Sequence, residues 1–298
     1  MKKYYSYYTG SLILIITLSF TPLNNNKKVV HFLSTNGEIS SAIMIPDYKD
    51  SLKIMQITDI HISIADANEA DMMKYGGRIH KAYSTPRKHY ARDTCETTFQ
   101  YFDDILQKAK NQNVNLLLLT GDIVNFPSAA SVKYVCDKLA STGIPWLYIA
   151  GNHDWHYEGL PGNIDSLRAD WTKKSLLPLY TGHNPLCYSA IIHGINFVAI
   201  DNSTGEVNDD QIRFLRVQLT MPEPIIMISH IPYSLNSKPV KPGMAAITDL
   251  ISSNTDKITA IFTGHEHRFS FYFTGNLCQY TTMAGFQGAS FMVNVKGN

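Results

Sequence analysis

Short apolar runs recur along the chain from residue 52 onward, and each run is bounded by turn-forming residues. Runs of about four to eight residues that are rich in Ile, Leu and Val are typical of buried β-strands. Two stretches, 186–192 and 277–295, resemble antiparallel strands instead. The pattern predicts six buried strands, at residues 53–59, 115–122, 146–152, 196–202, 225–230 and 259–265.

The segments between these strands carry a helical pattern. In residues 94–110, Phe99, Phe102 and Leu106 are three and four positions apart, so they share one face of a helix. Strands that alternate with helices form βαβ units, which predicts an α/β fold with helices on the faces of its sheets. No linker interrupts the pattern, which indicates one domain over residues 50–298. Further helices are predicted at residues 129–140, 163–174, 208–219 and 243–253.

The first 26 residues have a different character. Lys2 and Lys3 precede a short apolar run from Ser11 to Phe20, and polar residues follow. A membrane span needs about 20 apolar residues, so this run fits the core of a signal peptide better. We therefore expect residues 1–26 to be a signal peptide or an N-terminal anchor. The protein would then be exported, whether periplasmic, secreted or on the cell surface, and would have no stable membrane span.

One connection is much longer than the others. Residues 62–92 join the first predicted strand to the first helix, and loops longer than about 12–15 residues are usually functional or disordered. Residues 66–92 contain six Lys or Arg residues against three Asp or Glu, with tyrosines between them. Two interpretations stay open: a solvated basic insertion on the surface, or a lid that presents cations to an anionic substrate.

Composition limits the classes of partner. The 298 residues are 44% hydrophobic and 17% charged, and the formal net charge is +1. This is a globular composition, and the near-zero charge argues against a general nucleic-acid binder, so no extended nucleic acid is expected as a partner. The chain has four cysteines, Cys95, Cys136, Cys187 and Cys278. They permit two disulfides in three pairings, or they are unpaired thiols.

Side chains that are able to bind metals follow five of the predicted strands, at the point where each strand ends. In open α/β sheets the ligand site lies beyond the carboxyl ends of the strands, so these turns should converge. The alternating spacing of Asp59 and His61 lets both side chains point to one side of an extended segment. Glycine before Asp122, Asn152 and His265 allows a close approach of the backbone. The five turns are Asp59-Ile60-His61, Gly121-Asp122, Gly151-Asn152-His153-Asp154, Ser229-His230 and Gly264-His265-Glu266-His267.

The motif order D-x-H, G-D, G-N-H-D, a later H and G-H-x-H resembles the calcineurin-like metallophosphoesterase superfamily. The chain is most similar to its exported bacterial members and its class III cyclic-nucleotide phosphodiesterases. The resemblance covers residues 59–267, and it implies a β-sandwich of mixed sheets flanked by helices, with two metal ions. It also implies that Asp59, His61 and His267 bind one metal, that Asn152, His230 and His265 bind the other, and that Asp122 bridges them.

The implied centre would hold divalent or mixed-valence transition metals. Imidazole, carboxylate and amide donors suit Mn, Fe, Zn or Co. Two such ions can clamp a phosphoryl group, and a hydroxide that bridges them would be the nucleophile. By the same resemblance, His153 would protonate the leaving oxygen or stabilise its charge, and Asp154 would orient His153. These two residues are the candidate catalytic side chains.

Two departures from relatives narrow the expected activity. Asn125 occupies the position at which purple acid phosphatases carry an iron-binding tyrosine, three residues after the bridging aspartate. The G-D-x-x-D-R-G run of Ser/Thr protein phosphatases does not follow Gly121. We expect a hydrolase of small phosphorylated substrates, either a phosphomonoesterase or a phosphodiesterase. The alternatives are a nucleotide-directed phosphodiesterase or nuclease, and a catalytically inactive surface binding protein.

Overall fold

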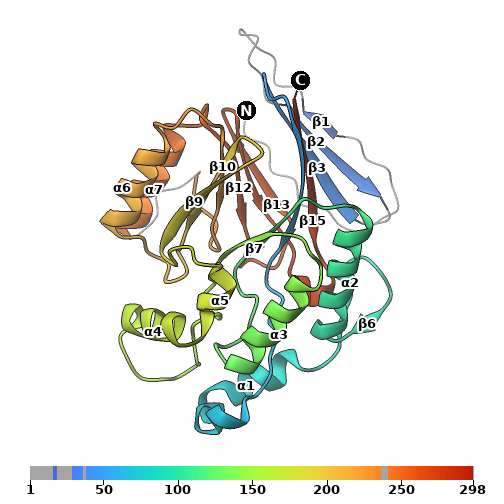
Figure 1. The fold of residues 1–298 in the computed structure, drawn as a ribbon, viewed down its shortest axis with the longest axis vertical. Coiled ribbons are helices and arrows are strands. Elements are labelled where there is room, and N and C mark those ends of the chain that lie inside the picture. The colour runs from blue at the N-terminus through green and yellow to red at the C-terminus, as the bar shows by residue number, and fades with distance from the viewer. Residues whose placement is uncertain (1–15, 19–28, 36–37, 236–240, 298) are drawn as a thin grey trace.

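The computed structural model describes residues 16–18, 29–35, 38–235 and 241–297, which form two facing β-sheets with helices outside them (Figure 1). The larger sheet has the strand order β1 (Ile16–Leu18), β2 (Val29–Thr35), β3 (Glu38–Ile45), β15 (Phe291–Gly297), β4 (Ser51–Ile57), β7 (Leu116–Thr120) and β8 (Trp146–Ile149). The smaller sheet has the order β13 (Ser270–Thr274), β14 (Leu277–Thr281), β12 (Ile258–Thr263), β11 (Ile225–Ile228), β10 (Ile195–Ile200) and β9 (Cys187–Ile192).

Helices cover the outer sides of both sheets. Figure 1 shows α6 (Asp209–Gln218) and α7 (Pro242–Ser252) outside the smaller sheet, and α2 (Thr98–Asn111) and α3 (Ala129–Ala140) beside the larger one. The remaining helical elements are η1 (Ala67–Met72), α1 (Met73–Tyr83), α4 (Ile164–Trp171), the π-helix η2 (Thr172–Leu176), α5 (Leu177–Tyr180) and η3 (Gly285–Gln287).

Successive residues of a strand in the smaller sheet face two separate apolar layers, one on each side of the sheet. Ile226 and Ile228 of β11 belong to the core that also contains residues of the larger sheet. Their neighbours Ile225 and Met227 pack instead with the residues that α6 and α7 bury. Successive side chains of a strand point to opposite faces, so a run that is apolar throughout is the sequence of a strand covered on both sides. This explains why β11 reads as four consecutive apolar residues.

The fold class predicted from the sequence is confirmed: two mixed sheets are flanked by helices. The six predicted buried strands are β4, β7, β8, β10, β11 and β12, and the five predicted helices are α2, α3, α4, α6 and α7.

The expected antiparallel pairing is only partly correct. β9 is antiparallel to β10, but β14 lies parallel to β12 and antiparallel to β13, and β15 is antiparallel to β4 but parallel to β3. A tight turn makes β13 and β14 antiparallel, whereas β12 and β14 are separated along the chain by β13, and β15 pairs with β3 and β4 from the opposite end of the chain. Local sequence therefore specifies the β13–β14 pair but not the partners of β15.

The long connection before α2 is an ordered insertion. It contains η1, α1 and a small sheet that pairs β5 (Arg87–Lys88) with β6 (Cys95–Glu96). The helix α1 was not predicted, because its sequence MKYGGRIHKAY includes adjacent glycines and few apolar residues.

The N-terminal prediction falls largely outside the described residues. Of residues 1–26, only 16–18 are described, as β1, which pairs antiparallel with β2. Within the described part of the chain, no helix has the length and apolarity that a membrane span requires. The four cysteines are free thiols, on β6, α3, β9 and β14.

Candidate metal centre

The five predicted turns converge at one end of the two sheets. Backbone hydrogen bonds join them directly: the amide of Asp59 donates to Gly121 O at 3.0 Å, and the amide of His61 donates to Asp122 O at 2.9 Å. On the smaller sheet, the amide of Gly264 donates to His230 O at 2.9 Å. The convergence expected from the carboxyl ends of the strands is therefore present.

Six of the predicted ligands form two groups, each with its ligand atoms within 4.8 Å of one another. One group is Asp59, His61 and His267, and the other is Asp122, His230 and His265. In each group, residues that follow strands of the larger sheet meet histidines that follow strands of the smaller sheet. Binding a cation in either group would therefore join the two sheets.

Asp122 belongs to the second group and also lies close to the first. Its Oδ2 is 3.3 Å from His230 Nε2 in its own group and 3.8 Å from His61 Nε2 in the other. Its Oδ1 accepts a hydrogen bond from the backbone amide of His153 at 2.8 Å. A carboxylate in this position can contribute an oxygen to both groups, as the predicted bridging role requires.

Two buried atoms of predicted ligands have no hydrogen-bond partner among the described residues. They are His61 Nε2, which faces Asp59 and Asp122, and the side-chain oxygen Oδ1 of Asn152. Burying a polar atom without a partner costs about 1–3 kcal/mol, so native proteins rarely do it. Each atom can donate an electron pair to a metal ion, and each belongs to a ligand of the predicted centre. The residues therefore fit a pair of metal ions.

The turns reach this geometry through an unusual backbone. Five of the seven predicted ligands have φ in the left-handed region, whereas an extended segment had been expected from the alternating spacing. Such angles cost about 1–3 kcal/mol and are concentrated at functional sites. The values are 51° for Asp59, 55° for His61, 53° for Asp122, 69° for His265 and 52° for His267.

Close approach explains two of the glycines. A Cβ on Gly151 would lie 2.2 Å from Asp122 Oδ1, and one on Gly264 would lie 1.9 Å from Thr58 Oγ1. No side chain fits at either position, because real Cβ atoms do not come nearer than about 3 Å to such neighbours. The prediction that glycine lets the backbone approach at these turns is confirmed.

Asp154 has different contacts from those predicted. It is fully buried, and its carboxylate accepts hydrogen bonds from the amides of Gly151 at 2.7 Å and of Asp122 and Val124 at 2.8 Å. None of its hydrogen bonds among the described residues reaches His153. Asp154 therefore fixes the backbone of two ligand-bearing turns, and it does not orient the imidazole as expected. Its carboxylate is oriented by three amides, a non-local pattern that sequence does not display.

His153 lies at the edge of the centre. Its imidazole meets the ring of His61 edge-on, with the ring centres 4.9 Å apart. The hydrogen bond from its backbone amide to Asp122 Oδ1 fixes the start of its side chain beside both groups. The half-buried imidazole is thus placed next to the predicted ligands.

Burial and charge shift the ionisation of these groups. Burial lowers the pKa of His61 to about 3, which leaves a neutral imidazole able to donate a lone pair. Burial acts in the same direction on His230, but the neighbouring Asp122 carboxylate outweighs it and raises the pKa of His230 to about 10. Burial and the charge of Asp122 together raise the pKa of Asp154 to about 7.

Supporting residues were not identified from the sequence as part of the site. Thr58 Oγ1 donates to Asp59 Oδ2 at 2.7 Å, and Asn125 Oδ1 lies 3.2 Å from His61 Nδ1. Asn202 Oδ1 accepts from the backbone amide of His230 at 3.2 Å. The sequence distinguishes Asn125 only as a replacement of a tyrosine, and Asn202 is far from every motif.

Three basic residues of the insertion have partners within the fold. Arg78 pairs with Glu158, and Lys88 Nζ lies 3.2 Å from Asp93. Arg87 donates to the carbonyl of Ala82. These contacts do not show the cation-presenting lid that was one of the two interpretations. The side chain of the insertion that reaches the centre is an aromatic one.

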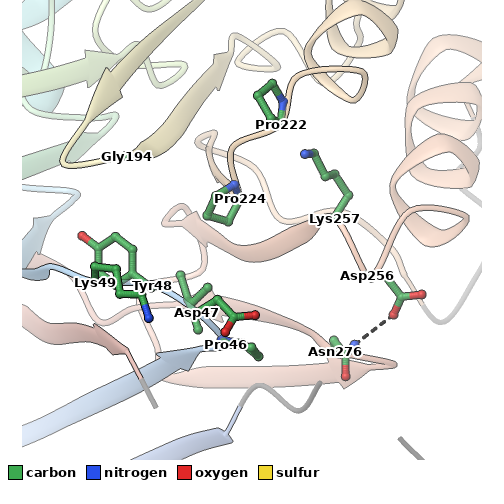
Figure 2. A pocket seen from close by; sticks show the side chains of 11 residues that line it. Pro46, Asp47, Tyr48, Lys49, Gly194, Pro222, Pro224, Asp256, Lys257 and Asn276 are labelled. Atoms are coloured by element: carbon green, nitrogen blue, oxygen red, sulfur yellow. Dashed lines mark hydrogen bonds between the residues drawn. The ribbon is translucent and has the colours of Figure 1, made fainter. Parts of the chain in front are cut away.

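A cavity of about 790 Å³ lies at the other end of the strands (Figure 2). Its lining comes from loops that precede strands, including residues 45–49 before β4 and Asp256 and Lys257 before β12. Figure 2 shows Asp256 hydrogen-bonded to Asn276 at its rim. None of the predicted ligands lines this cavity, so it is separate from the candidate centre.

Residues 52–269 match the calcineurin-like phosphoesterase family. The chain belongs to this family. The matched region includes every predicted ligand, and the assignment makes the chain a metallophosphoesterase-family enzyme with two candidate His/Asp metal groups. The expectation of an enzyme is therefore confirmed, as is the resemblance from which it came.

Two curated relatives match this phosphoesterase over short stretches. A probable cyclic nucleotide phosphodiesterase of Moraxella catarrhalis is 41% identical over 61 residues, which are 20% of this chain and 22% of the relative. Another, of Psychrobacter arcticus, is 28% identical over 116 residues, 38% of this chain and 34% of the relative. The chain thus spans about a fifth and a third of the curated relatives that it matches.

Solved structures of low sequence identity share the fold. A dimetal phosphatase from Danio rerio has a TM-score of 0.52 at 13% identity, covering 79% of this chain and 88% of that one. A purple acid phosphatase from yellow lupin has a TM-score of 0.50 at 13% identity, covering 88% and 51%.

Proposed function

We propose that this phosphoesterase hydrolyses small phosphodiesters, with cyclic nucleotides as the leading substrate class, at a centre of two transition-metal ions. The observation that carries the proposal is the pair of adjoining His/Asp groups with Asp122 between them and two buried, unpartnered donor atoms beside them. The substrate class is supported by the names of the two curated relatives. The near-zero net charge also favours a small substrate over a nucleic-acid strand.

The ligand assignment follows the two groups. Asp59, His61 and His267 would bind one ion, Asn152, His230 and His265 the other, and Asp122 both. These oxygen and nitrogen donors suit Mn, Fe, Zn or Co. When bound, the two ions would polarise the phosphoryl group and lower the pKa of a coordinated water.

The protein's own contribution to bond cleavage falls to His153. Its imidazole lies beside the ring of His61, at the edge of both groups, so it can reach a leaving oxygen of a phosphodiester placed between them. A protonated imidazole would give that oxygen its proton as the P–O bond breaks. The backbone hydrogen bonds accepted by Asp154 hold the turns of Asp122 and Gly151 in register for this step.

The test is a substrate panel on the purified, metal-stripped chain reloaded in turn with Mn, Fe, Zn and Co. The panel contains bis(p-nitrophenyl) phosphate, p-nitrophenyl phosphate, 3′,5′- and 2′,3′-cyclic nucleotides, and a short oligonucleotide. We expect the diester and the cyclic nucleotides to be hydrolysed fastest. Preference for the monoester or the oligonucleotide would reject the substrate class, and no turnover with any metal would reject the function.

Asp122→Asn is the matched control for this panel. An amide at this position keeps the shape of the side chain but loses the charge that both groups use. We expect the variant to lose both ions, as measured by elemental analysis after dialysis, and to lose activity on every substrate. Full occupancy by two ions in Asp122→Asn would contradict the bridging role.

A further inference from the structure

Helix α1 of the insertion is docked on the segment that follows β4. His80 Nδ1 lies 2.8 Å from Ser63 Oγ, and the ring of Tyr83 stacks on the ring of His61 with centres 4.1 Å apart and planes 20° apart. Residues three apart lie on one face of a helix, so His80 and Tyr83 contact the same segment side by side. The last turn of α1 therefore brings an aromatic face onto a predicted metal ligand.

The neighbours of His61 restrict its ring in different ways. Asn125 Oδ1 fixes the position of Nδ1, while His153 and Phe286 meet the ring from other sides, with centres 4.9 and 5.7 Å away. The second side-chain torsion of histidine is soft, so neighbours must set the plane of the ring. Of these rings, Tyr83 alone is nearly parallel to His61, which makes it the contact that defines this plane.

The position of Tyr83 is itself fixed. Its ring meets Phe286 edge-on at 5.2 Å, and the amide of Phe286 donates to Asp59 O at 3.0 Å. The Arg87 guanidinium lies 5.9 Å from the centre of the Tyr83 ring, and its hydrogen bond to Ala82 O ties it to the end of α1. Tyr83 thus packs against Phe286, and the backbone of Phe286 is hydrogen-bonded to the turn that carries Asp59.

The histidines of the two groups are positioned by different parts of the fold. His230, in the second group, is positioned by Thr120 O, 2.9 Å from its Nδ1, and by Asn202 through its backbone amide. These partners come from β7 of the larger sheet and the loop after β10, whereas the ring of His61 also stacks on a residue of the insertion. Loss of the Tyr83 ring should consequently affect one group and spare the other.

We propose that Tyr83 is a positioning residue that holds His61 in its ligating orientation, so that the insertion controls occupancy of the Asp59–His61–His267 group. The inference rests on the proposed two-metal function. Contacts that orient a ligand commonly change metal affinity about 10–100-fold when they are removed. The insertion is thereby a structural support of the centre, and Arg78 ties it to Glu158.

The experiment titrates the metal-free full chain with Mn²⁺ by calorimetry and follows the same samples by electron paramagnetic resonance. We expect two ions in the wild type, with the spectrum of a spin-coupled pair. Tyr83→Ala should bind one ion as tightly as the wild type and the second about 10–100-fold more weakly, giving the spectrum of an isolated ion at limiting metal. Tyr83→Phe should behave as the wild type, because stacking needs the ring and not the hydroxyl.

Two further variants complete the test. Tyr83→Leu fills a similar volume without a flat face, so it should reproduce the loss even if Tyr83→Ala does not fold. Tyr75→Ala removes another half-buried tyrosine of α1, whose ring contacts Lys74, and should leave both affinities unchanged. If the wild type binds two ions and both Tyr83→Leu and Tyr83→Ala bind them equally well, the role of Tyr83 is overturned. If the wild type binds fewer than two, the proposed function fails with it.

Discussion

At the scale of single residues, the predicted ligands depend on hydrogen bonds that the motifs do not reveal. Asp154 is the clearest case, because its carboxylate bonds to three backbone amides and not to the imidazole beside it in the sequence. A buried carboxylate with three donors can be fully satisfied without a side-chain partner. The motif G-N-H-D therefore contains two kinds of residue: those that face the centre, and one that shapes the turn.

His153 can be separated from the ligands by a single substitution. We expect His153→Ala to lower kcat about 10²–10⁴-fold, the usual contribution of a general acid, while two ions remain bound. Steady-state kinetics with the best diester and elemental analysis of the same sample measure both quantities. His156→Ala is the control, since that imidazole, three residues after His153, stacks on the adjacent Trp155. Loss of metal in His153→Ala would show that His153 is a ligand.

The residues of the centre were predictable to the extent that they lie in the turns. Their types and order along the chain identified the ligand-bearing turns, and the structure brings six of these side chains into two groups. Thr58, Asn125, Asn202 and Tyr83 were not identified as contributors, because each acts through one contact with a residue distant in sequence or through a local geometry no motif encodes. The left-handed backbone of the ligands was missed for a similar reason, since it is set by packing between turns.

At the scale of elements, apolar runs located the strands because a strand covered on both faces has no polar side. Pairing partners were harder to predict, as β15 shows, because both of its neighbours, β3 and β4, come from the opposite end of the chain. The start of helix α2, in contrast, is predictable from the local sequence. It is encoded by Thr97 and Gln100, which form a reciprocal capping box.

This cap makes a measurable contribution to stability. Thr97 Oγ1 accepts from the amide of Gln100 at 3.3 Å, and the amide of Thr97 donates to Gln100 Oε1 at 2.9 Å. We expect Thr97→Ala to lower the free energy of unfolding by about 1 kcal/mol, as measured by urea denaturation. Thr97→Ser retains a hydroxyl cap and should stay close to the wild type. Equal losses in both variants would show that the methyl group, and not the cap, matters.

At the scale of the whole molecule, the two sheets are joined at one end by their ligand-bearing turns. Both groups combine residues that follow β4 or β7 of the larger sheet with histidines that follow β11 or β12 of the smaller one. At the other end, loops of both sheets surround the cavity of about 790 Å³. Metal ions bound in the two groups would therefore act as cross-links between the halves of the sandwich.

Metal removal should accordingly lower thermal stability. A ligand that binds only the folded state at 100 times its Kd stabilises that state by about 2.7 kcal/mol. We expect addition of a chelator to lower the Tm of the Mn-loaded chain by several degrees, as followed by calorimetry. Asp122→Asn is the control and should melt at the same temperature with or without Mn. An unchanged Tm in the chelated wild type would contradict cross-linking by the metal.

The left-handed backbone at five of the ligands also bears on how such a centre changes over generations. Apart from glycine, Asn, Asp and His are the residues that adopt this conformation most readily, and all three offer oxygen or nitrogen donors. Their codons differ from one another at a single base. A substitution at these turns is tolerated only if the new residue adopts the left-handed conformation. The residues that do so most readily also bind metals, so one ligand type can replace another through a single base change. Preference among metals can drift in this way while the turn and the fold stay the same.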